Sequence, residues 1–294
     1  MVSYSCIITG MARDSTPYSK EMNFFDTAYL SFFGEATTVS ERLFNPLYRS
    51  SFDRALRFIP SSTVMQRDIC ETGCNIARYL FYFKALGARH AIGCDLSHGI
   101  LRRALLPHHN YVRNASVAPG HVDLVQCLAE QLPLHDSTID TLFCFRSLHH
   151  FINKEAFISQ GRRILKENGL FIIVEPSGSN PFRILANKIG KHFKYLTEGE
   201  NACVPENVLD TLKRNDFEIM NISYYNMLSE ANVHIGELSK RYSKLLYIIV
   251  SVILFFTNTI DTILAPVINR SLHKLSWSFV IIARKGSPTR SDRA

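Results

Sequence analysis

Short apolar runs alternate with helical patterns through the middle of the chain. A run over residues 68–72 is followed by apolar positions at helical spacing, which end at Gly87. A second run, over residues 90–94, ends in Asp95. This order predicts a strand–turn–helix–strand unit with an acid at the tip of its second strand. Such a unit suits a nucleotide, because the turn allows close backbone approach and the acid can accept bonds from both ribose hydroxyls.

The alternation continues towards the C-terminus. Helix signals follow Asn153 and extend to Asn168-Gly169, and a second late helix is expected over residues 205–214. Further strands are expected over residues 121–126, 141–145, 170–174, 217–225 and 277–283. Strands that alternate with helices indicate a parallel sheet with right-handed crossovers and a site at the carboxyl ends of the strands.

Composition narrows the class of protein. The 294 residues are 46% hydrophobic and 20% charged, which is typical of a globular chain. The net charge of +7 is spread out, apart from a basic cluster at residues 240–244, so nucleic-acid binding is not favoured. Seven cysteines without a Cys-x-x-Cys pair indicate small buried side chains in a reducing compartment, and no metal site is expected. Residues 1–14 lack the pattern of a signal peptide, so we expect a cytoplasmic protein.

Five short motifs occur in an order that is typical of one family. They are Glu71-Thr72-Gly73-Cys74-Asn75-Ile76-Ala77, Asp95-Leu96-Ser97, residues 129–134, Leu148-His149-His150-Phe151 and residues 163–169. Together they resemble the class I S-adenosylmethionine-dependent methyltransferases, particularly type 11-like domains that act on small molecules and lipids. The resemblance covers residues 68–176. It implies a Rossmann-like, doubly wound, mostly parallel seven-stranded α/β sheet with an antiparallel last strand, and S-adenosylmethionine as the cofactor.

The resemblance also implies cofactor-binding residues. These are Glu71, Gly73, Asn75, Asp95, Leu96, Ala129, Glu130 and Arg146. Asp95 is expected to accept hydrogen bonds from the two ribose hydroxyls of the cofactor. The family's second and third glycines are replaced by Asn75 and Ala77, which strains or narrows the turn without abolishing it. Leu128 stands where many relatives carry an aspartate, so the bond to the adenine amino group is lost or comes from Glu130.

The acceptor side is expected at the ends of the next two strands. His149 and His150 follow the fourth strand of the sheet, and Glu175 ends the fifth. Histidine suits proton removal from a hydroxyl acceptor at neutral pH, so these three residues are the catalytic candidates. A structural or cofactor-side role for the histidines, and neutralisation of an acidic acceptor by Arg146, are alternatives.

Two regions lie outside the resemblance. Residues 1–60 include many aromatic side chains in residues 22–58, which predict short helices that form a lid or pack against the sheet. The core is assigned to residues 61–228 and 276–285, an apolar helical insertion to residues 229–275, and a disordered tail to residues 286–294. Within the insertion, Leu245 to Phe256 is shorter than the roughly twenty residues that span a bilayer. Burial or a substrate cap, a homodimer through residues 243–272 and peripheral membrane contact are the alternatives.

These features favour an enzyme that transfers a methyl group to a small or lipid-like acceptor at oxygen. The departures at Asn75, Ala77 and Leu128 keep one alternative, a weak or inactive methyltransferase-like subunit that binds a partner or a membrane surface. A nicotinamide dehydrogenase fits poorly, since the turn has one glycine where that fingerprint needs three.

Overall fold

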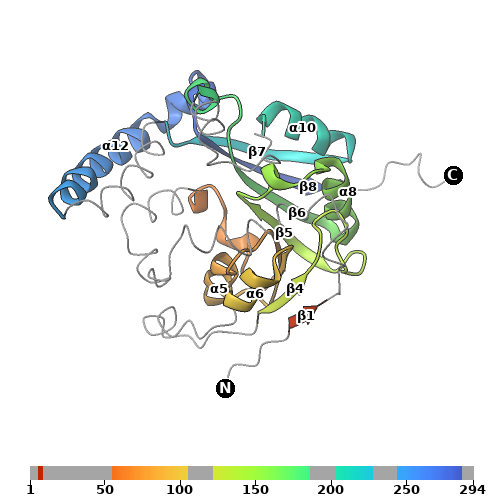
Figure 1. Cartoon of the computed structure of the whole chain (residues 1–294). Coiled ribbons are helices and arrows are strands. Elements are labelled where there is room, and N and C mark those ends of the chain that lie inside the picture. Colours follow the sequence, from red (N-terminus) through yellow and green to blue (C-terminus); the bar gives the residue numbers. More distant parts are fainter. Residues whose placement is uncertain (1–5, 9–54, 105–121, 186–202, 228–243, 287–294) are drawn as a thin grey trace.

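The computed structural model describes residues 6–8, 55–104, 122–185, 203–227 and 244–286. In this part of the chain, the strands form one sheet in the order β1-β4-β3-β2-β5-β6-β8-β7 (Figure 1). They are β1 (Cys6–Ile8), β2 (Asp68–Thr72), β3 (His90–Asp95), β4 (Asp123–Gln126), β5 (Ile139–Phe145), β6 (Leu165–Pro176), β7 (Phe217–Tyr225) and β8 (Ser278–Lys285). Only β8 runs antiparallel to its neighbours, β6 and β7. The expected seven-stranded sheet is confirmed in β2 to β8. The short strand β1 extends it beyond β4, in a stretch where the sequence pattern predicts no strand.

Helices cover both faces of the sheet. They are α5 (Arg78–Ala85), α6 (His98–Ala104), α8 (Lys154–Ile164), α10 (Pro205–Arg214) and α12 (Lys244–Arg270), with 3₁₀ turns η2 (Ser61–Thr63), η3 (Leu148–His150) and η4 (His273–Leu275). Phe83 of α5 and Leu101 of α6 belong to one buried cluster, and Phe157 of α8 and Leu212 of α10 belong to the other. The doubly wound arrangement therefore has a separate core on each face.

The strand sequences explain this two-sided core. Along β5, Leu142 and Cys144 face one cluster while Phe143 and Phe145 face the other, as the two-residue period of a strand requires. All four side chains are buried. The six cysteines at positions 70, 74, 94, 127, 144 and 203 are likewise buried free thiols, which confirms the expectation that they act as small apolar side chains.

Several element boundaries differ from the predicted ones. Helix α5 begins at Arg78, because Ala77 before it has a left-handed backbone (φ 56°). The predicted extension of α8 to Gly169 is wrong: the helix ends at Ile164, and Leu165 already pairs with Ile139 of β5. The predicted capping of α8 is confirmed, since Asn153 Oδ1 accepts a hydrogen bond from the Ala156 N–H at 2.9 Å.

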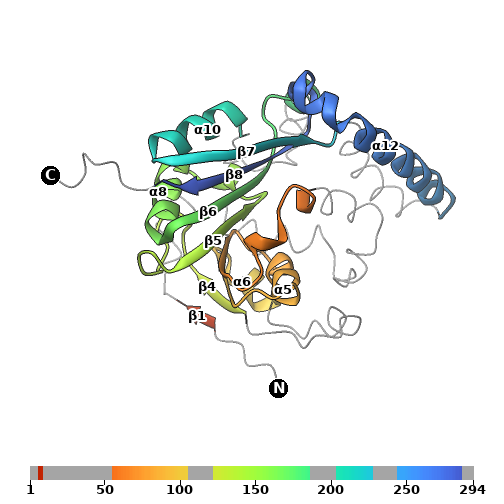
Figure 2. The same cartoon turned by 180° about the vertical axis from the view of Figure 1, so that it is seen from behind.

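The apolar insertion contains one long helix. Helix α12 has 27 residues and continues well past Phe256, because apolar side chains recur at helical spacing after a short polar stretch. Its C-terminal part is tied to β7: the Asn269 side-chain amide bonds with the backbone of Tyr224 in both directions, at 2.8 and 3.2 Å. From there, α12 extends away from the sheet (Figure 2). In the described part of the chain, no helix combines the length and the apolar character needed to cross a membrane.

The expected burial of this apolar run is not observed on one side of the helix. Between Leu245 and Phe256, six apolar side chains are 46–69% exposed, namely Leu245, Ile248, Ile249, Val252, Ile253 and Phe256. The aromatic residues before position 55, on which most of the predicted lid depends, lie outside the described residues. So do residues 287–294 of the predicted tail.

A cluster of charged side chains joins the strands at their amino ends. Asp68 at the start of β2 accepts hydrogen bonds from the Arg89 guanidinium and from Lys166 Nζ (2.8 Å), and His90 Nδ1 lies 2.8 Å from its other oxygen. Asp140 of β5 accepts from the Asp68 N–H (2.8 Å) and from Lys166 (3.0 Å). The guanidinium of Arg89 holds the pKa of the Asp68 carboxyl well below its usual range. The cluster therefore fixes the starts of β2, β3, β5 and β6.

Replacing Asp68 by Asn should lower the free energy of unfolding by about 1–2 kcal/mol at neutral pH, because several charge-assisted bonds weaken together. A depressed carboxyl pKa stabilises the fold above the unfolded-state value of about 4 and loses that contribution as the pH falls further. The difference between Asp68→Asn and wild type should therefore shrink below about pH 4 in denaturant titrations. Asp136→Asn is the matched control: its carboxylate pairs with Arg163 at 2.6 Å but is 74% exposed, so about 0.5 kcal/mol or less is expected. Equal losses in the two variants would contradict this role.

Candidate active site

The turn after β2 has an unusual backbone. Gly73, Asn75 and Ala77 all have left-handed φ angles, of 65°, 53° and 56°. Glycine adopts this region freely and asparagine tolerates it, whereas alanine does so at a cost. The expected strain at the two replaced glycines is therefore present, and the turn still forms.

Hydrogen bonds within the protein hold this turn. The Asn75 N–H donates to Asp95 Oδ2 at 2.8 Å, and the Ile76 N–H donates to Asn75 Oδ1 at 2.7 Å. The backbone N–H groups of Cys74 and Ala77 donate to the carbonyls of Cys94 (3.1 Å) and Cys74 (2.8 Å). Because these donors are already used, the turn is poorly suited to a pyrophosphate. It better suits a nucleoside that carries no phosphate.

Gly73 is required by a close approach as well as by its φ angle. A Cβ atom at position 73 would lie 2.3 Å from Ser147 Cβ and 2.6 Å from Ser147 Oγ. Ser147, the second residue after β5, also donates from its hydroxyl to the Thr72 carbonyl at 3.0 Å. The ends of β2 and β5 are thus locked together at this point.

Asp95 lies at the tip of β3, as predicted. Its Oδ2 accepts from the Asn75 N–H, and its Oδ1 accepts from the Ser97 N–H at 2.9 Å. The Gln126 side chain holds the following loop by donating to the Leu96 carbonyl at 3.1 Å. A carboxylate has about four acceptor positions, so these bonds orient Asp95 in a way compatible with the expected ribose contact.

The loop after β4 brings the next pair of predicted residues to the same edge. Ala129 is buried, and the Cys127 N–H before it donates to the Asp95 carbonyl at 3.0 Å. Glu130 Oε1 accepts from the Asn153 N–H at 3.2 Å, so this oxygen is directed towards the start of α8. Glu130 therefore has a structural bond in addition to any contact with adenine.

Arg146 follows β5 directly. Its backbone is left-handed (φ 50°), its N–H donates to the Val174 carbonyl at 2.7 Å, and the residue is exposed. The buried Glu71 lies near the end of β2, opposite Gly93 of β3 and Phe143 of β5. The eight predicted cofactor residues thus lie at the carboxyl ends of four adjacent strands, β4, β3, β2 and β5.

The acceptor-side candidates form a buried pair. Glu175 near the end of β6 is fully buried, and its Oε1 accepts from the Leu148 N–H at 2.7 Å. Its Oε2 lies 2.7 Å from His149 Nδ1, and His149 is only 7% exposed. His150 is half-buried, with its ring centroid 4.1 Å from that of His149. Because a carboxylate only accepts, this geometry favours the tautomer in which Nδ1–H donates to Glu175.

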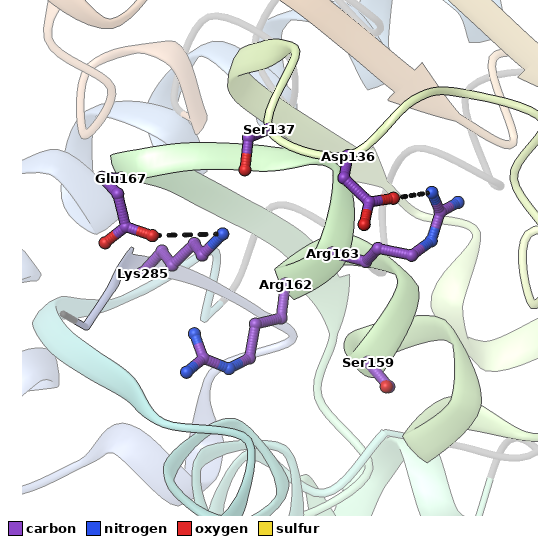
Figure 3. A pocket seen from close by; sticks show the side chains of 7 residues that line it. All are labelled: Asp136, Ser137, Ser159, Arg162, Arg163, Glu167 and Lys285. Carbon is purple, nitrogen blue, oxygen red and sulfur yellow. Dashed lines mark hydrogen bonds and ion pairs between the residues drawn. The ribbon is translucent and has the colours of Figure 1, made fainter. Parts of the chain in front are cut away.

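A hollow of about 380 Å³ lies at the opposite end of the sheet (Figure 3). It is lined by Asp136, Ser137, Ser159, Arg162, Arg163, Glu167 and Lys285. Its basic groups already have partners: Arg163 bonds Asp136, Arg162 pairs with Asp216 at 3.3 Å, and Lys285 donates to the Leu165 carbonyl at 2.8 Å. This hollow lies away from the carboxyl edge and is a structural feature of the fold.

Sequence reasoning missed three positioning residues, Ser147, Ser97 and Gln126. Each is a small or amide side chain at the end of a predicted strand or in the loop that follows it. Ser147 could have been suspected from its place two residues after β5, but its contact with Gly73 depends on the pairing of β2 with β5. Ser97 and Gln126 carry no local signal of their bonds to the Asp95 loop.

The family comparison agrees with this geometry. Residues 70–173 match a family model described as "Methyltransferase domain". The chain contains a class I S-adenosylmethionine-dependent methyltransferase domain. The matched segment runs from β2 to β6 and holds nearly all of the residues discussed above.

Curated relatives support the same assignment for the methyltransferase domain. A probable S-adenosylmethionine-dependent methyltransferase of Mycobacterium tuberculosis is 24% identical over 152 residues, which are 51% of this chain and 50% of the relative. The ubiquinone/menaquinone biosynthesis C-methyltransferase UbiE of Cronobacter sakazakii is 28% identical over 133 residues, 40% of this chain and 52% of that protein. The chain thus spans about half the length of the curated relatives it matches.

Solved structures show the same fold. The magnesium protoporphyrin IX methyltransferase of Synechocystis PCC 6803, solved with bound S-adenosylhomocysteine, superposes with a TM-score of 0.56 at 13% identity and covers 90% of this chain and 98% of its own. The expected fold and family are therefore confirmed, and S-adenosylmethionine is supported as the cofactor of the methyltransferase domain.

Replacing Gly73 by Ala should destabilise the protein by about 2–4 kcal/mol, since the new methyl group meets Ser147 and the backbone is left-handed. The affinity of this variant for S-adenosylmethionine should also fall, as measured by calorimetric titration corrected for the folded fraction. Gly87→Ala is the matched control: Gly87 also has a positive φ (95°), but its added Cβ would meet nothing within 4 Å. It should cost about 1 kcal/mol and leave cofactor affinity unchanged. Similar stability and affinity in both variants would refute the role of the close approach.

Proposed function

We propose that this protein is an S-adenosylmethionine-dependent methyltransferase that methylates an oxygen atom of a small or lipid-like acceptor. One observation carries the proposal: Ser147, Leu148 and His149 connect the glycine turn to the buried Glu175. Ser147 contacts Gly73, while the Leu148 N–H and the His149 ring both bond with Glu175. A cofactor turn and a buried histidine–carboxylate pair are thus joined by three consecutive residues.

The residues present suit the proposed cofactor. Asp95 is held at the tip of β3 by backbone bonds, and the turn from Gly73 to Ala77 uses its own donors internally. When bound, S-adenosylmethionine supplies a methyl group on a sulfonium, an electrophile that needs alignment and exclusion of water more than activation. The protein's remaining task is to orient the acceptor and remove its proton.

His149 is the proposed base. With Nδ1–H donated to Glu175, the second ring nitrogen, Nε2, carries the lone pair that accepts the acceptor's hydroxyl proton. Glu175 acts through His149: it fixes the tautomer and stabilises the imidazolium that forms. His150 is the second candidate base, since its ring packs against that of His149.

The acceptor class is inferred from one relative and from helix α12. The relative from Cronobacter sakazakii is named for ubiquinone/menaquinone biosynthesis, which fits an apolar acceptor, and the exposed apolar side chains of α12 fit it too. That relative is a C-methyltransferase. The choice of oxygen therefore rests on the proposed proton transfer to His149.

The proposal is first tested by calorimetric titration with S-adenosylmethionine and S-adenosylhomocysteine. We expect micromolar binding, which Asp95→Ala should weaken by about 100-fold or more, because two bonds between a charged group and the ribose hydroxyls are lost. Asp210→Ala, at an exposed acid on α10, is the matched control and should bind as wild type does. Absence of heat and of any thermal shift at millimolar ligand would sink the enzyme assignment and leave the non-catalytic alternative.

The roles of the histidines are separated by single-turnover methylation with tritiated S-adenosylmethionine. A hydroquinone, a catechol and a long-chain fatty acid serve as test acceptors. With the acceptor that is methylated, His149→Ala should slow methyl transfer by about 100- to 10,000-fold with little change in cofactor affinity. Glu175→Gln should slow transfer less and change the dependence of the rate on pH, since it alters the basicity of His149. A larger loss in His150→Ala than in His149→Ala would instead assign the base to His150.

A further inference from the structure

Helix α12 carries a long exposed stripe that is apolar except for Thr259. Nine of its side chains are 42–70% exposed, namely Leu245, Ile248, Ile249, Val252, Ile253, Phe256, Ile260, Ile263 and Val267. At about 100° per residue, these positions all fall within an arc of about 140° of the helix surface. Soluble proteins rarely expose an apolar surface of this length unless it meets a partner or a lipid phase.

The opposite side of the helix attaches it to the domain. Ile268 is fully buried and Asp261 is 3% exposed, and both lie away from the apolar stripe on the helical wheel. The bonds between Asn269 and Tyr224 fix the C-terminal part against β7. The helix is thus anchored with its apolar stripe facing outwards.

The charged residues of the sequence from position 240 to position 274 are basic except for Asp261. Asp261 is the sole acidic residue of the sequence between positions 244 and 286, and it is buried. Arg270 and Lys274 are exposed at the C-terminal end, and residues 240, 241 and 244 in the sequence before it are Lys, Arg and Lys. An exposed apolar helix face with basic residues next to it in the sequence and no exposed acid is typical of helices that lie in the interface of an anionic bilayer.

A second apolar patch lies beside the base of α12. Phe182, Ile184 and Leu185 are 62%, 46% and 58% exposed. They follow Asn180, whose side-chain amide donates to the Leu275 carbonyl at 2.6 Å, shortly after α12 ends. The bond between Asn180 and Leu275 therefore joins the segment that leaves β6 to the segment that follows α12.

This surface borders the carboxyl edge of the sheet. The Ser177 N–H donates to the Trp277 carbonyl at 2.7 Å, and the Trp277 N–H donates to the Asn226 carbonyl at 2.7 Å. Ser177 lies two residues after Glu175. Hydrogen bonds and short stretches of chain therefore connect the C-terminal end of α12 with Glu175 on the proposed acceptor side.

We propose that α12 docks on an anionic lipid bilayer, with the apolar stripe in the interface and the carboxyl edge of the sheet next to the membrane. An acceptor that resides in the bilayer would then reach His149 without crossing water. This last step rests on the proposed methyltransferase function, whereas the docking itself does not.

The charges argue against a second copy of the chain as the partner. A symmetric antiparallel pair of α12 helices would bring the basic residues at one end of the stripe next to those at the other end. No exposed acid of α12 or of the segment up to residue 286 offsets them. Anionic headgroups neutralise the same residues.

The test is cosedimentation of the full chain with large unilamellar vesicles. One set contains equal parts of phosphatidylglycerol and phosphatidylcholine, and the other contains phosphatidylcholine alone. We expect binding to the anionic vesicles that is weaker on phosphatidylcholine and is reduced by added salt. The double variant Val252→Glu/Phe256→Glu, at the centre of the stripe, should lower the partition coefficient by about tenfold or more.

Met65→Glu is the matched control, since Met65 is a 54% exposed apolar residue at the amino end of the sheet. It should bind vesicles as wild type does, and circular dichroism should show that both variants are folded. Wild-type protein that stays in solution with both lipids, or a double variant that sediments like wild type, would overturn the proposal. A dimer in light scattering that the double variant dissociates, without vesicle binding, would assign the stripe to a second copy.

Titration of the same samples with S-adenosylmethionine keeps the two proposals apart. Vesicle binding without cofactor binding would refute the proposed function and leave the docking intact. Cofactor binding without vesicle binding would refute the docking and leave the proposed function intact.

Discussion

The contact between Gly73 and Ser147 is the constraint on which the carboxyl edge depends. No side chain fits at position 73, because Ser147 occupies the space where a Cβ would lie. The same serine bonds with Thr72, so the ends of β2 and β5 are fixed relative to each other. From this point, the turn to Ala77 continues into α5, and the 3₁₀ turn that carries His149 continues towards α8. The proposed cofactor side and the proposed acceptor side are thus positioned by one close approach of the backbone, and Glu175 extends the arrangement to β6.

The two ends of the sheet have different chemistry. At the amino ends, opposite charges are paired: Asp68 and Asp140 bind Arg89 and Lys166 in a cluster that stabilises the strand starts. At the carboxyl ends, the carboxylates of Asp95 and Glu175 are bonded mainly to backbone N–H groups and to a histidine. Backbone bonds orient a carboxylate without neutralising its charge. That difference is one reason why the proposed site is placed at the carboxyl edge.

Much of the fold could be predicted from local pattern. Helix α10 and strand β7 have the predicted bounds, because Pro205 marks a helix start and residues favoured in strands recur from Phe217 to Tyr225. The errors lie where a tertiary contact decides. Leu165 pairs with Ile139 instead of continuing α8, and the short strand β1 exists through its pairing with β4. In the site, the motif order pointed to Asp95 and Gly73, but the bond between His149 and Glu175 depends on the alignment of β5 with β6. Sequence spacing alone does not give that alignment.

The insertion that contains α12 enters and leaves the domain at one place. Asn226 follows β7, Trp277 precedes β8, and the Trp277 N–H bonds directly with the Asn226 carbonyl. The pairing of β7 with β8 therefore extends to both ends of the insertion and does not depend on the sequence of the insertion. The entropy of closing a loop grows only slowly with its length. The sheet can thus carry a different insertion at this position without a change in the residues of the proposed site.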